Sequence, residues 1–392
     1  MKICDVTQFY APRSGGVKRY LHAKIDYLQQ HSLGDEHVLI VPGARTEKTA
    51  NGSCSIHTIA SPLVSRSTGY RALLNLRAVN EVIEREQPDI IESADPYQLG
   101  WKLAATAKRR LLPAVAFYHS GFGEAYLRPR VAPFGGRAAN ATMRICERYV
   151  QKLYNRFEVT FVPSEELAVR LRGWGVRDVR VVELGVDTDV FNPGRADTSG
   201  IRAELGVLET AKLLIYVGRL AAEKNTSTLF AAFEILARRR PGSFHLLVVG
   251  DGQQRTMIDE LRAKTNAVTW LAYCSEATRL AQLYRAADLF VHPGTQETFG
   301  LVALEAQACG TPVVGIRGSA MDRIILHDQS AWALENSPDT FADAIERTAS
   351  LDLHALGATA SKLVAQRYSW RRVFDRLFCI YREVCAEYAA TR

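Results

Sequence analysis

The sequence lacks any long apolar run, and none of its hydrophobic stretches reaches the roughly 20 residues that a membrane-spanning helix needs. The opening residues MKICDVTQFY have the pattern of a strand, without the charged and apolar regions of a signal peptide. We therefore expect a cytoplasmic protein, with peripheral attachment to the inner face of the cell membrane as the alternative to a free one.

Two further patterns are missing. The seven cysteines include no C-x-x-C pair, and an odd number does not suggest a disulfide framework. Gly250-Asp251-Gly252 begins like the dinucleotide fingerprint G-x-G-x-x-G, but Arg255 occupies the position of the third glycine. We expect most of the cysteines to be buried small hydrophobic residues.

The bulk composition indicates a globular protein with two domains. A chain of 392 residues is longer than one hydrophobic core usually organises. The net charge of +7 favours polyanionic partners, namely an anionic lipid surface, nucleic acid or an acidic small substrate. Ordinary solubility explains the same charge equally well.

Short apolar segments alternate with helical stretches in both halves of the chain, which predicts an α/β fold with mostly parallel, doubly wound sheets. The polar segment from Asn192 to Gly200 marks the boundary between the halves. This gives domains at 1–194 and 195–370, followed by an amphipathic helix at 371–392. The expected strands are 3–7, 37–41, 56–59, 89–92, 114–119, 159–163, 179–182, 212–217, 245–250, 268–271 and 289–291, and the expected helices include 17–30, 70–86, 97–109, 226–239 and 299–309.

Two glutamates frame the predicted start of helix 299–309. Glu297 lies in the loop before it, and Glu305 interrupts the apolar stripe of the helix. A carboxylate on a buried stripe needs hydrogen-bond donors, which the hydroxyls of a ligand can supply. The ordinary alternative is that Glu297 complements the helix dipole and that Glu305 is half-exposed.

Two cations stand before the predicted helix 226–239. Arg219 and Lys224 oppose the dipole at its N-terminus, so their placement favours an anion bound between them. The alternative is a solvated loop in which Glu223 pairs with a neighbour.

Three further features are candidates for a binding site. Gly15 and Gly16 follow the first strand, and paired glycines at a helix start let the backbone approach a ligand closely. His119 stands at the carboxyl end of a predicted parallel strand, where ligands bind in such folds, although a lone histidine is often structural. Tyr273 follows strand 268–271 and either stacks on a ligand or packs against the sheet.

The motif E-x-F-G-x-x-x-x-E at 297–305, followed by A-C-G-T-P-V-V, closely resembles the donor site of retaining glycosyltransferases of family 4. The segments S-G-G-V at 14–17, G-V-D-x-x-x-F-x-P at 185–193 and G-R-L-x-x-E-K-N at 218–225 strengthen the resemblance. It implies the GT-B fold, with two Rossmann-like domains facing across a cleft and a C-terminal helix that crosses back to the first domain. The segment 315–322 departs from the glycine-rich run ending in P-E that is common in the family.

The resemblance implies a role for each candidate residue. Glu297 contacts the donor sugar, Glu305 holds the ribose, and His119 lies close to the sugar. Arg219 and Lys224 grip the diphosphate, so His119, Arg219, Lys224 and Glu297 are the implied catalytic residues. The backbone amides that face the diphosphate are those of Thr298, Phe299, Gly300 and Leu301, while Gly15 and Gly16 border the phosphates and Tyr273 lines the nucleobase pocket.

Basic residues concentrate in the segment 126–157, where five recur at intervals of seven and then four and therefore share one helical face. A solvated face is one interpretation, and a patch that binds an anionic membrane surface is the other. The five residues are Arg137, Arg144, Arg148, Lys152 and Arg156.

The sequence thus predicts a retaining hexosyltransferase that uses a nucleotide-diphospho-sugar, with GDP-mannose favoured, and a lipid or glycan hydroxyl as acceptor. A UDP-hexose-dependent enzyme of the same fold and a GT-B-like sugar-nucleotide epimerase remain alternatives. No nucleic-acid partner and no cofactor are expected. Asp187-x-Asp189 suits a divalent cation, but it falls in the segment that resembles the family's linker, so no metal is expected either.

Overall fold

A computed structural model describes residues 1–11, 16–31, 34–64, 69–119, 136–194, 197–295, 297, 299–318 and 320–391. The chain divides into two compact units. Unit 1 contains Met1–Leu184 together with Trp370–Arg392, and unit 2 contains Gly185–Ser369.

Within its described residues, unit 1 is built on an eight-stranded sheet in the order β3-β4-β2-β1-β5-β6-β7-β8. Neighbouring strands are parallel except for β3, which pairs antiparallel with β4 at the edge. Most of the inner strands are apolar and buried, as strands covered on both faces must be. The strands are β1 (Lys2–Val6), β2 (Glu36–Gly43), β3 (Glu47–Asn51), β4 (Cys54–Ala60), β5 (Ile90–Ser93), β6 (Ala114–Phe117), β7 (Val159–Val162) and β8 (Val179–Val181).

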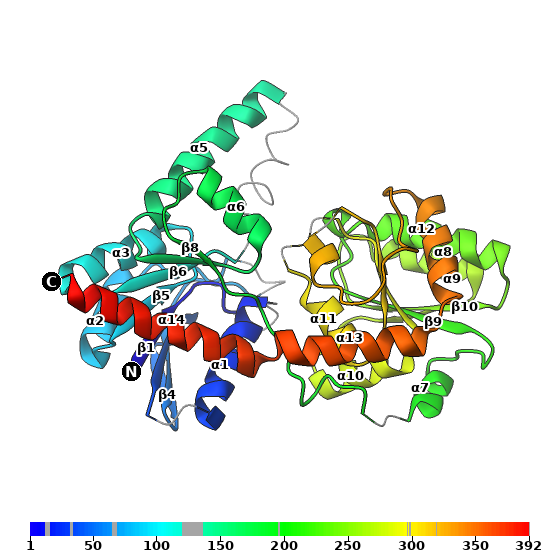
Figure 1. The fold of residues 1–392 in the computed structure, drawn as a ribbon, viewed down its shortest axis with the longest axis horizontal. Helices are drawn as coiled ribbons and strands as arrows, with labels where there is room; N and C mark the ends of the chain where they lie inside the picture. The colour runs from blue at the N-terminus through cyan, green and yellow to red at the C-terminus, as the bar shows by residue number, and fades with distance from the viewer. Residues whose placement is uncertain are drawn as a thin grey trace. The chain divides into compact units, whose positions relative to one another are not determined.

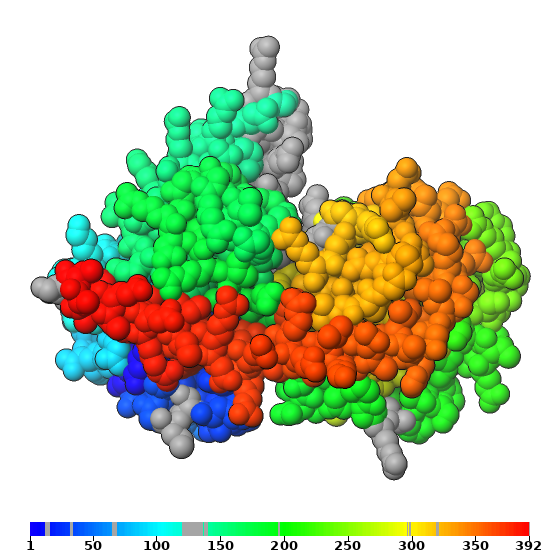
Figure 2. Space-filling model, viewed as in Figure 1, coloured from blue at the N-terminus to red at the C-terminus, as the bar shows by residue number. Residues whose placement is uncertain are grey.

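The helices of unit 1 include the last helix of the chain. Figure 1 shows α14 lying alongside α1, and Tyr27 of α1 donates a hydrogen bond of 2.6 Å to Asp375 of α14. The side chains of α14 form a red band on the surface of the unit in Figure 2. The helices are α1 (Gly16–His31), α2 (Leu76–Glu86), α3 (Gln98–Arg110), α5 (Gly136–Tyr154), α6 (Glu165–Gly173) and α14 (Trp370–Ala390).

Unit 2 has a five-stranded parallel sheet, within its described residues, in the order β11-β10-β9-β12-β13. Its strands are β9 (Lys212–Val217), β10 (Phe244–Val249), β11 (Val268–Leu271), β12 (Leu289–His292) and β13 (Val313–Gly315). Its helices are α7 (Thr198–Glu204), α8 (Thr226–Arg239), α9 (Thr256–Thr265), α10 (Ala277–Ala286), α11 (Leu301–Ala308), α12 (Pro338–Ala349) and α13 (Leu353–Tyr368), with short 3-10 turns at η3 (Ala222–Lys224) and η4 (Ala320–Arg323).

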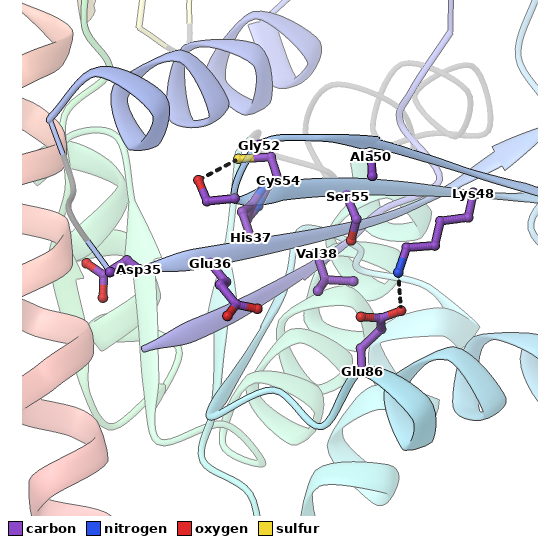
Figure 3. A pocket seen from close by; sticks show the side chains of 12 residues that line it. Asp35, Glu36, His37, Val38, Lys48, Ala50, Gly52, Cys54, Ser55 and Glu86 are labelled. Carbon is purple, nitrogen blue, oxygen red and sulfur yellow. Dashed lines mark hydrogen bonds and ion pairs between the residues drawn. The ribbon is translucent and has the colours of Figure 1, made fainter.

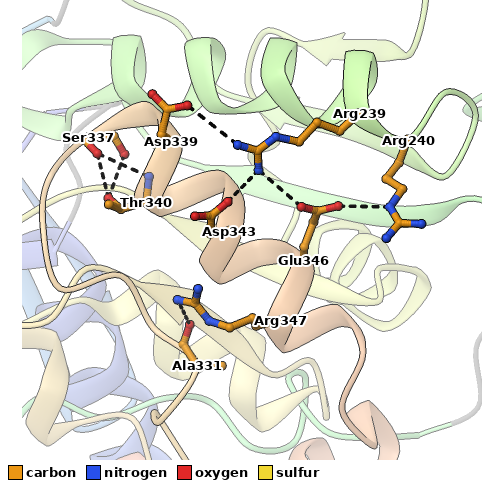
Figure 4. A network of polar contacts seen from close by, with 9 residues as sticks. All are labelled: Arg239, Arg240, Ala331, Ser337, Asp339, Thr340, Asp343, Glu346 and Arg347. Atoms are coloured by element: carbon orange, nitrogen blue, oxygen red, sulfur yellow. Dashed lines mark hydrogen bonds and ion pairs between the residues drawn. The ribbon is translucent and has the colours of Figure 1, made fainter.

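Ion pairs fix the C-terminal end of α8 to α12 (Figure 4). Arg239 lies 2.6 Å from Asp343 and 3.4 Å from Glu346, and Arg240 lies 3.3 Å from Glu346. These ion pairs lie at the end of α8 opposite to Lys224.

Two elements differ from the sequence expectation. Strand β3 was not expected, because its residues EKTAN are polar and exposed, and it forms only by pairing with β4. Helix α2 begins at Leu76, later than the expected 70, because Asn75 caps it and Arg71 pairs with Leu63 before it. No helix among the described residues combines the length and apolar character needed to cross a membrane.

The division between the units falls before Gly185, earlier than the position after Gly194 that the sequence suggested. Hydrogen bonds explain the difference. Val186 donates to the Tyr368 carbonyl at 2.7 Å, and Arg285 donates to the carbonyls of Val190 and Asn192. The segment 185–194 is therefore part of unit 2.

Candidate functional site

The carboxyl ends of strands β9 and β12 bring two of the predicted motifs together. These strands are neighbours in the parallel sheet of unit 2, although a long stretch of sequence separates them. The loop after β9 carries Arg219 and Lys224, and the loop after β12 carries Glu297. Loops that leave neighbouring strands at this edge form the usual ligand site of an open parallel sheet.

Lys224 and Glu297 form an ion pair across the two loops. Their side chains are only 20% and 13% exposed, so water screens the pair weakly. Burial alone raises the pKa of Glu297, but the charge and hydrogen bond of Lys224, together with the neighbouring His292 and Arg219, outweigh burial and hold that pKa below its ordinary value. Glu297 is therefore a carboxylate at neutral pH, with a cation as its partner.

Asn225 ties the two loops together. Its side-chain amide donates to the Pro293 carbonyl at 3.0 Å and to the Thr295 hydroxyl at 3.4 Å. Asn225 also has a left-handed backbone, with φ of 52°, at the start of α8. The positions of Lys224 and Glu297 are thus fixed relative to each other by a second contact.

Helix α11 begins at Leu301, two positions later than the expected Phe299, because Gly300 has a left-handed φ of 85°. A Cβ atom at Gly300 would lie 2.3 Å from the Met321 sulfur, so only glycine fits there. Phe299 is buried, whereas Thr298 lies outside the described residues.

Glu305 is buried on α11, with 5% of its surface exposed, so the half-exposed alternative is wrong. The Tyr284 hydroxyl donates to its Oε2 at 3.3 Å. A buried carboxylate needs hydrogen-bond donors, as we expected from the position of Glu305 on the apolar stripe of the helix.

Arg219 contrasts with Lys224. Its guanidinium is 71% exposed and pairs with Glu223 at 3.1 Å. The pairing with Glu223 that the sequence left open is therefore present in the free protein. An exposed pair of this kind is weak, so Arg219 can exchange Glu223 for another anion at little cost.

Tyr273 is 62% exposed, so the alternative in which it packs against the sheet is wrong. Trp270, in strand β11, is instead the aromatic residue held against the sheet. Its indole donates to the Gly250 carbonyl at 2.8 Å, and Arg255 lies over its ring.

In unit 1, His119 follows the carboxyl end of β6. Its ring stacks on Phe117 with centroids 4.1 Å apart and meets the edge of Tyr20 at 5.5 Å. Burial lowers the pKa of His119 to about 3, so the ring is neutral at pH 7. Its Nε2 makes no hydrogen bond with any residue that the structure describes. Gly16 begins α1 and is exposed, and Gly15 lies outside the described residues.

Sequence reasoning missed a buried charge cluster in unit 1. Lys24 is fully buried and lies 2.9 Å from Asp5 and 3.4 Å from Glu92, and its ammonium donates to the Tyr381 hydroxyl of α14 at 2.7 Å. Its signal in the sequence was a lysine on the apolar stripe of α1, the same kind of signal that marked Glu305.

Sequence reasoning also missed His292, the last residue of β12. Its Nε2 lies 3.5 Å from Oε1 of Glu297. The rule that selected His119, a histidine at the carboxyl end of a parallel strand, selects His292 as well.

Asp187 is occupied within the chain. Its Oδ1 accepts hydrogen bonds from the backbone of Asp189 and Val190, which closes a turn. In the part of the chain that the structure describes, no group of three histidine, cysteine or acidic side chains is arranged to hold a metal ion.

A polar depression of about 520 Å³ lies in unit 1 (Figure 3). It is lined by the amino ends of β2 and β4, including Glu36, His37 and Cys54, and the ion pair of Lys48 with Glu86 borders it. His119 follows the opposite, carboxyl edge of the same parallel sheet. The depression is therefore separate from the predicted site.

Comparison with solved structures defines the class of fold. Sucrose-phosphate synthase from Thermosynechococcus elongatus has a TM-score of 0.78 at 20% identity, over 98% of this chain and 99% of that chain. A glycosyltransferase from Rickettsia africae has a TM-score of 0.75 at 17% identity, over 98% of each chain. The chain thus has the GT-B fold of two Rossmann-like α/β domains.

Comparison of sequences then defines the family. A model described as Glycosyltransferase Family 4 matches residues 14–190, and a model described as Glycosyl transferases group 1 matches residues 197–362. A GDP-mannose-dependent alpha-(1-6)-phosphatidylinositol dimannoside mannosyltransferase from Mycobacterium tuberculosis is 31% identical over 95% of this chain and 93% of its own length. A GDP-mannose-dependent alpha-mannosyltransferase from Corynebacterium glutamicum is 30% identical over 83% of this chain and 74% of its own length. The chain belongs to glycosyltransferase family 4, and it is a glycosyltransferase.

Proposed function

We propose that the protein is a retaining α-mannosyltransferase that moves mannose from GDP-mannose to a hydroxyl of a lipid or glycan acceptor. The names of the two relatives from Mycobacterium tuberculosis and Corynebacterium glutamicum, both GDP-mannose-dependent, support the donor. The phosphatidylinositol dimannoside named in the first supports an acceptor that combines glycan and lipid.

The observation that carries the proposal is the ion pair of Lys224 with Glu297 at the carboxyl edge of the sheet. A nucleotide-sugar carries an anionic diphosphate and a sugar rich in hydroxyls. The ammonium suits the first group and the carboxylate suits the second, so one donor satisfies both partners of the pair.

The chemistry follows from these charges. Lys224 and Arg219 neutralise the negative charge that develops on the leaving GDP, assisted by backbone N–H groups at the start of α11. The acceptor oxygen attacks the anomeric carbon on the face from which the diphosphate departs, and the acceptor proton passes to the departing phosphate oxygen. The neutral ring of His119 helps to position the sugar.

Glu297 is not assigned the role of a nucleophile. Its carboxylate is paired with Lys224, which stabilises the anion and weakens its basicity. We assign it to the sugar hydroxyls, whose hydrogen bonds replace part of that pairing.

A thermal-shift panel of GDP-mannose, UDP-glucose and ADP-glucose tests the donor. A donor present at 100 times its Kd stabilises the protein by about 2.7 kcal/mol, so the cognate donor raises the melting temperature by several degrees. GDP-mannose is expected to do so. If only UDP-glucose raises the melting temperature, GDP-mannose is not the donor and the UDP-hexose alternative holds.

Release of nucleotide from the stabilising donor separates transfer from epimerisation. A transferase releases GDP rapidly only when an acceptor is present. Release at the same rate without acceptor, accompanied by isomerised sugar, would identify an epimerase instead.

We further propose that the basic face of α5 binds an anionic membrane surface. Arg144, Arg148 and Lys152 are exposed on it, and Ile145 beside them is 68% exposed. Cations next to an exposed apolar side chain suit an interface between lipid head groups and acyl chains. The side chain of Arg137 and the segment 126–135 lie outside the described parts of the chain.

A further inference from the structure

His292 is a buried histidine whose ring nitrogens lack a hydrogen-bond partner among the residues that the structure describes. Its side chain is 3% exposed, and its ring lies roughly parallel to that of Phe290, with 18° between the planes. Neither ring nitrogen makes a hydrogen bond with a residue that the structure describes. A buried N–H without a partner is unfavourable, so a native protein keeps one chiefly where a partner arrives later.

The carboxylate of Glu297 lies close to the ring of His292. Nε2 of His292 lies 3.5 Å from Oε1 of Glu297, too far for a good hydrogen bond, and the Lys224 ammonium occupies the same oxygen. Burial lowers the pKa of His292 to about 4, so the ring is neutral at pH 7 and carries a single N–H. The tautomer with the proton on Nε2 carries its N–H on the nitrogen that lies 3.5 Å from Glu297.

The loop is shaped around the ring. A Cβ atom at Gly294 would lie 2.9 Å from Nε2 of His292, so the backbone passes over the imidazole only because glycine stands there. Asn225 holds the neighbouring Pro293 and Thr295 from the start of α8. The ring and the loop that carries Glu297 therefore keep a fixed relation when the ligand arrives.

We propose that His292 is the positioning residue of Glu297. When a donor binds, its diphosphate draws Lys224 away from Glu297, and the Nε2–H of His292 then donates to the released carboxylate. His292 thereby stabilises the negative charge of Glu297 and keeps its carboxylate oriented toward the sugar hydroxyls. The inference rests on the proposed function for the identity of the ligand and adds a residue to its machinery.

Three substitutions of His292 separate positioning from packing. His292→Gln places an amide N–H near the position of Nε2, His292→Asn places one near Nδ1, and His292→Phe keeps the ring without a donor. We expect His292→Phe and His292→Asn to lower kcat on the order of tenfold to a hundredfold, while His292→Gln restores most of the loss. Affinity for free GDP falls in His292→Phe and His292→Asn as well, by less than about tenfold, because the diphosphate of GDP also releases Glu297 from Lys224. Equal losses of kcat in the three variants, or a loss of GDP affinity as large as the loss of kcat, would overturn the proposal.

His245→Phe is the matched control. His245 lies near the amino end of β10 in the same sheet, where it bonds the Thr269 hydroxyl at 2.8 Å. Its substitution is expected to lower the melting temperature with little change in kcat. A double substitution of His292→Phe with Glu297→Gln should lower kcat no further than Glu297→Gln alone, and additive losses would contradict the coupling.

A spectroscopic measurement tests the inference apart from turnover. In protein labelled with ¹⁵N-histidine, the resonances of His292 are identified by their absence from His292→Gln. Saturating inorganic pyrophosphate, which supplies the diphosphate without a base or sugar, is expected to move the His292 Nε2–H proton downfield. That shift in a protein that transfers no sugar would reject the proposed function and keep the inference. An unchanged resonance, or a proton on Nδ1, would reject the inference even in an active enzyme.

Discussion

At the scale of single residues, the two glutamates of the donor motif differ in their surroundings. Glu297 is paired with a cation, Lys224, whereas Glu305 is buried and accepts from the neutral hydroxyl of Tyr284. The difference fits separate roles, one for the sugar and one for the ribose.

Glu305→Gln keeps size and shape but exchanges a charged acceptor for a neutral amide. We expect it to weaken the binding of GDP and of GDP-mannose alike, by roughly 1.5–3 kcal/mol for a charge-assisted hydrogen bond. Glu297→Gln should leave GDP binding close to wild type while kcat with GDP-mannose falls. Calorimetry with GDP and steady-state kinetics with GDP-mannose measure both effects. Equal losses of GDP affinity in the two variants would refute the division of roles.

Arg219→Ala removes a cation that forms an exposed ion pair with Glu223. We expect weaker binding of GDP and GDP-mannose by similar amounts, about 1.5–3 kcal/mol, because the two ligands share the diphosphate. The melting temperature should change little. GDP affinity equal to that of wild type would remove Arg219 from the site.

At the scale of elements, helix α14 contacts the core of unit 1 through a hydrogen bond to the buried side chain of Glu92. Burial, partly opposed by Lys24, raises the pKa of Glu92 to about 7, and Tyr381 of α14 donates to its Oε2. The folded state therefore holds this proton more tightly than the unfolded state does. Its contribution to stability is complete below the ordinary glutamate pKa and is lost as pH rises through about 7.

Glu92→Gln fixes a neutral side chain and removes this titration. We expect the melting temperature of wild type to fall more between pH 5 and pH 8 than that of the variant, by several degrees. Calorimetry at the two pH values measures the difference. Parallel pH dependence in both proteins would show that the proton on Glu92 does not contribute.

Helix α5 gives a prediction about the membrane. Reversing the charge of Arg144 and Arg148 should lower the affinity for anionic vesicles, measured by co-sedimentation, by one to two orders of magnitude. Each cation contributes about 1 kcal/mol near such a surface. Raised salt should weaken wild type in the same direction. Equal sedimentation of both proteins would leave the basic face as a solvated surface.

The elements show what the sequence can and cannot predict. Strands β9 and β11 have their predicted bounds. In β9 the run 213–216 is apolar and buried on both faces, a pattern that the sequence reveals directly. Strand β3 could not be predicted, because its pairing with β4, and not its own polar residues, makes it a strand. In the site, the motifs located Lys224 and Glu297, but their pairing depends on β9 lying beside β12, which no local pattern reveals.

At the scale of the whole molecule, we expect activity without a divalent cation. Asp187 caps a turn, and cations of the chain itself stand where the diphosphate is proposed to bind. Turnover of GDP-mannose in EDTA should remain within about twofold of the untreated rate, in contrast to enzymes that use a metal for this charge. Full loss in EDTA, restored by Mn²⁺ or Mg²⁺, would contradict the assignment of that charge to Arg219 and Lys224.

The stereochemistry of transfer tests the central claim most directly. In the proposed mechanism the acceptor attacks on the face from which GDP departs, so the α configuration of GDP-mannose is kept. NMR of the freshly formed product, recorded before any anomerisation, measures the configuration of the new linkage. The account predicts an α-mannoside, and a β-mannoside formed from the α donor would contradict it.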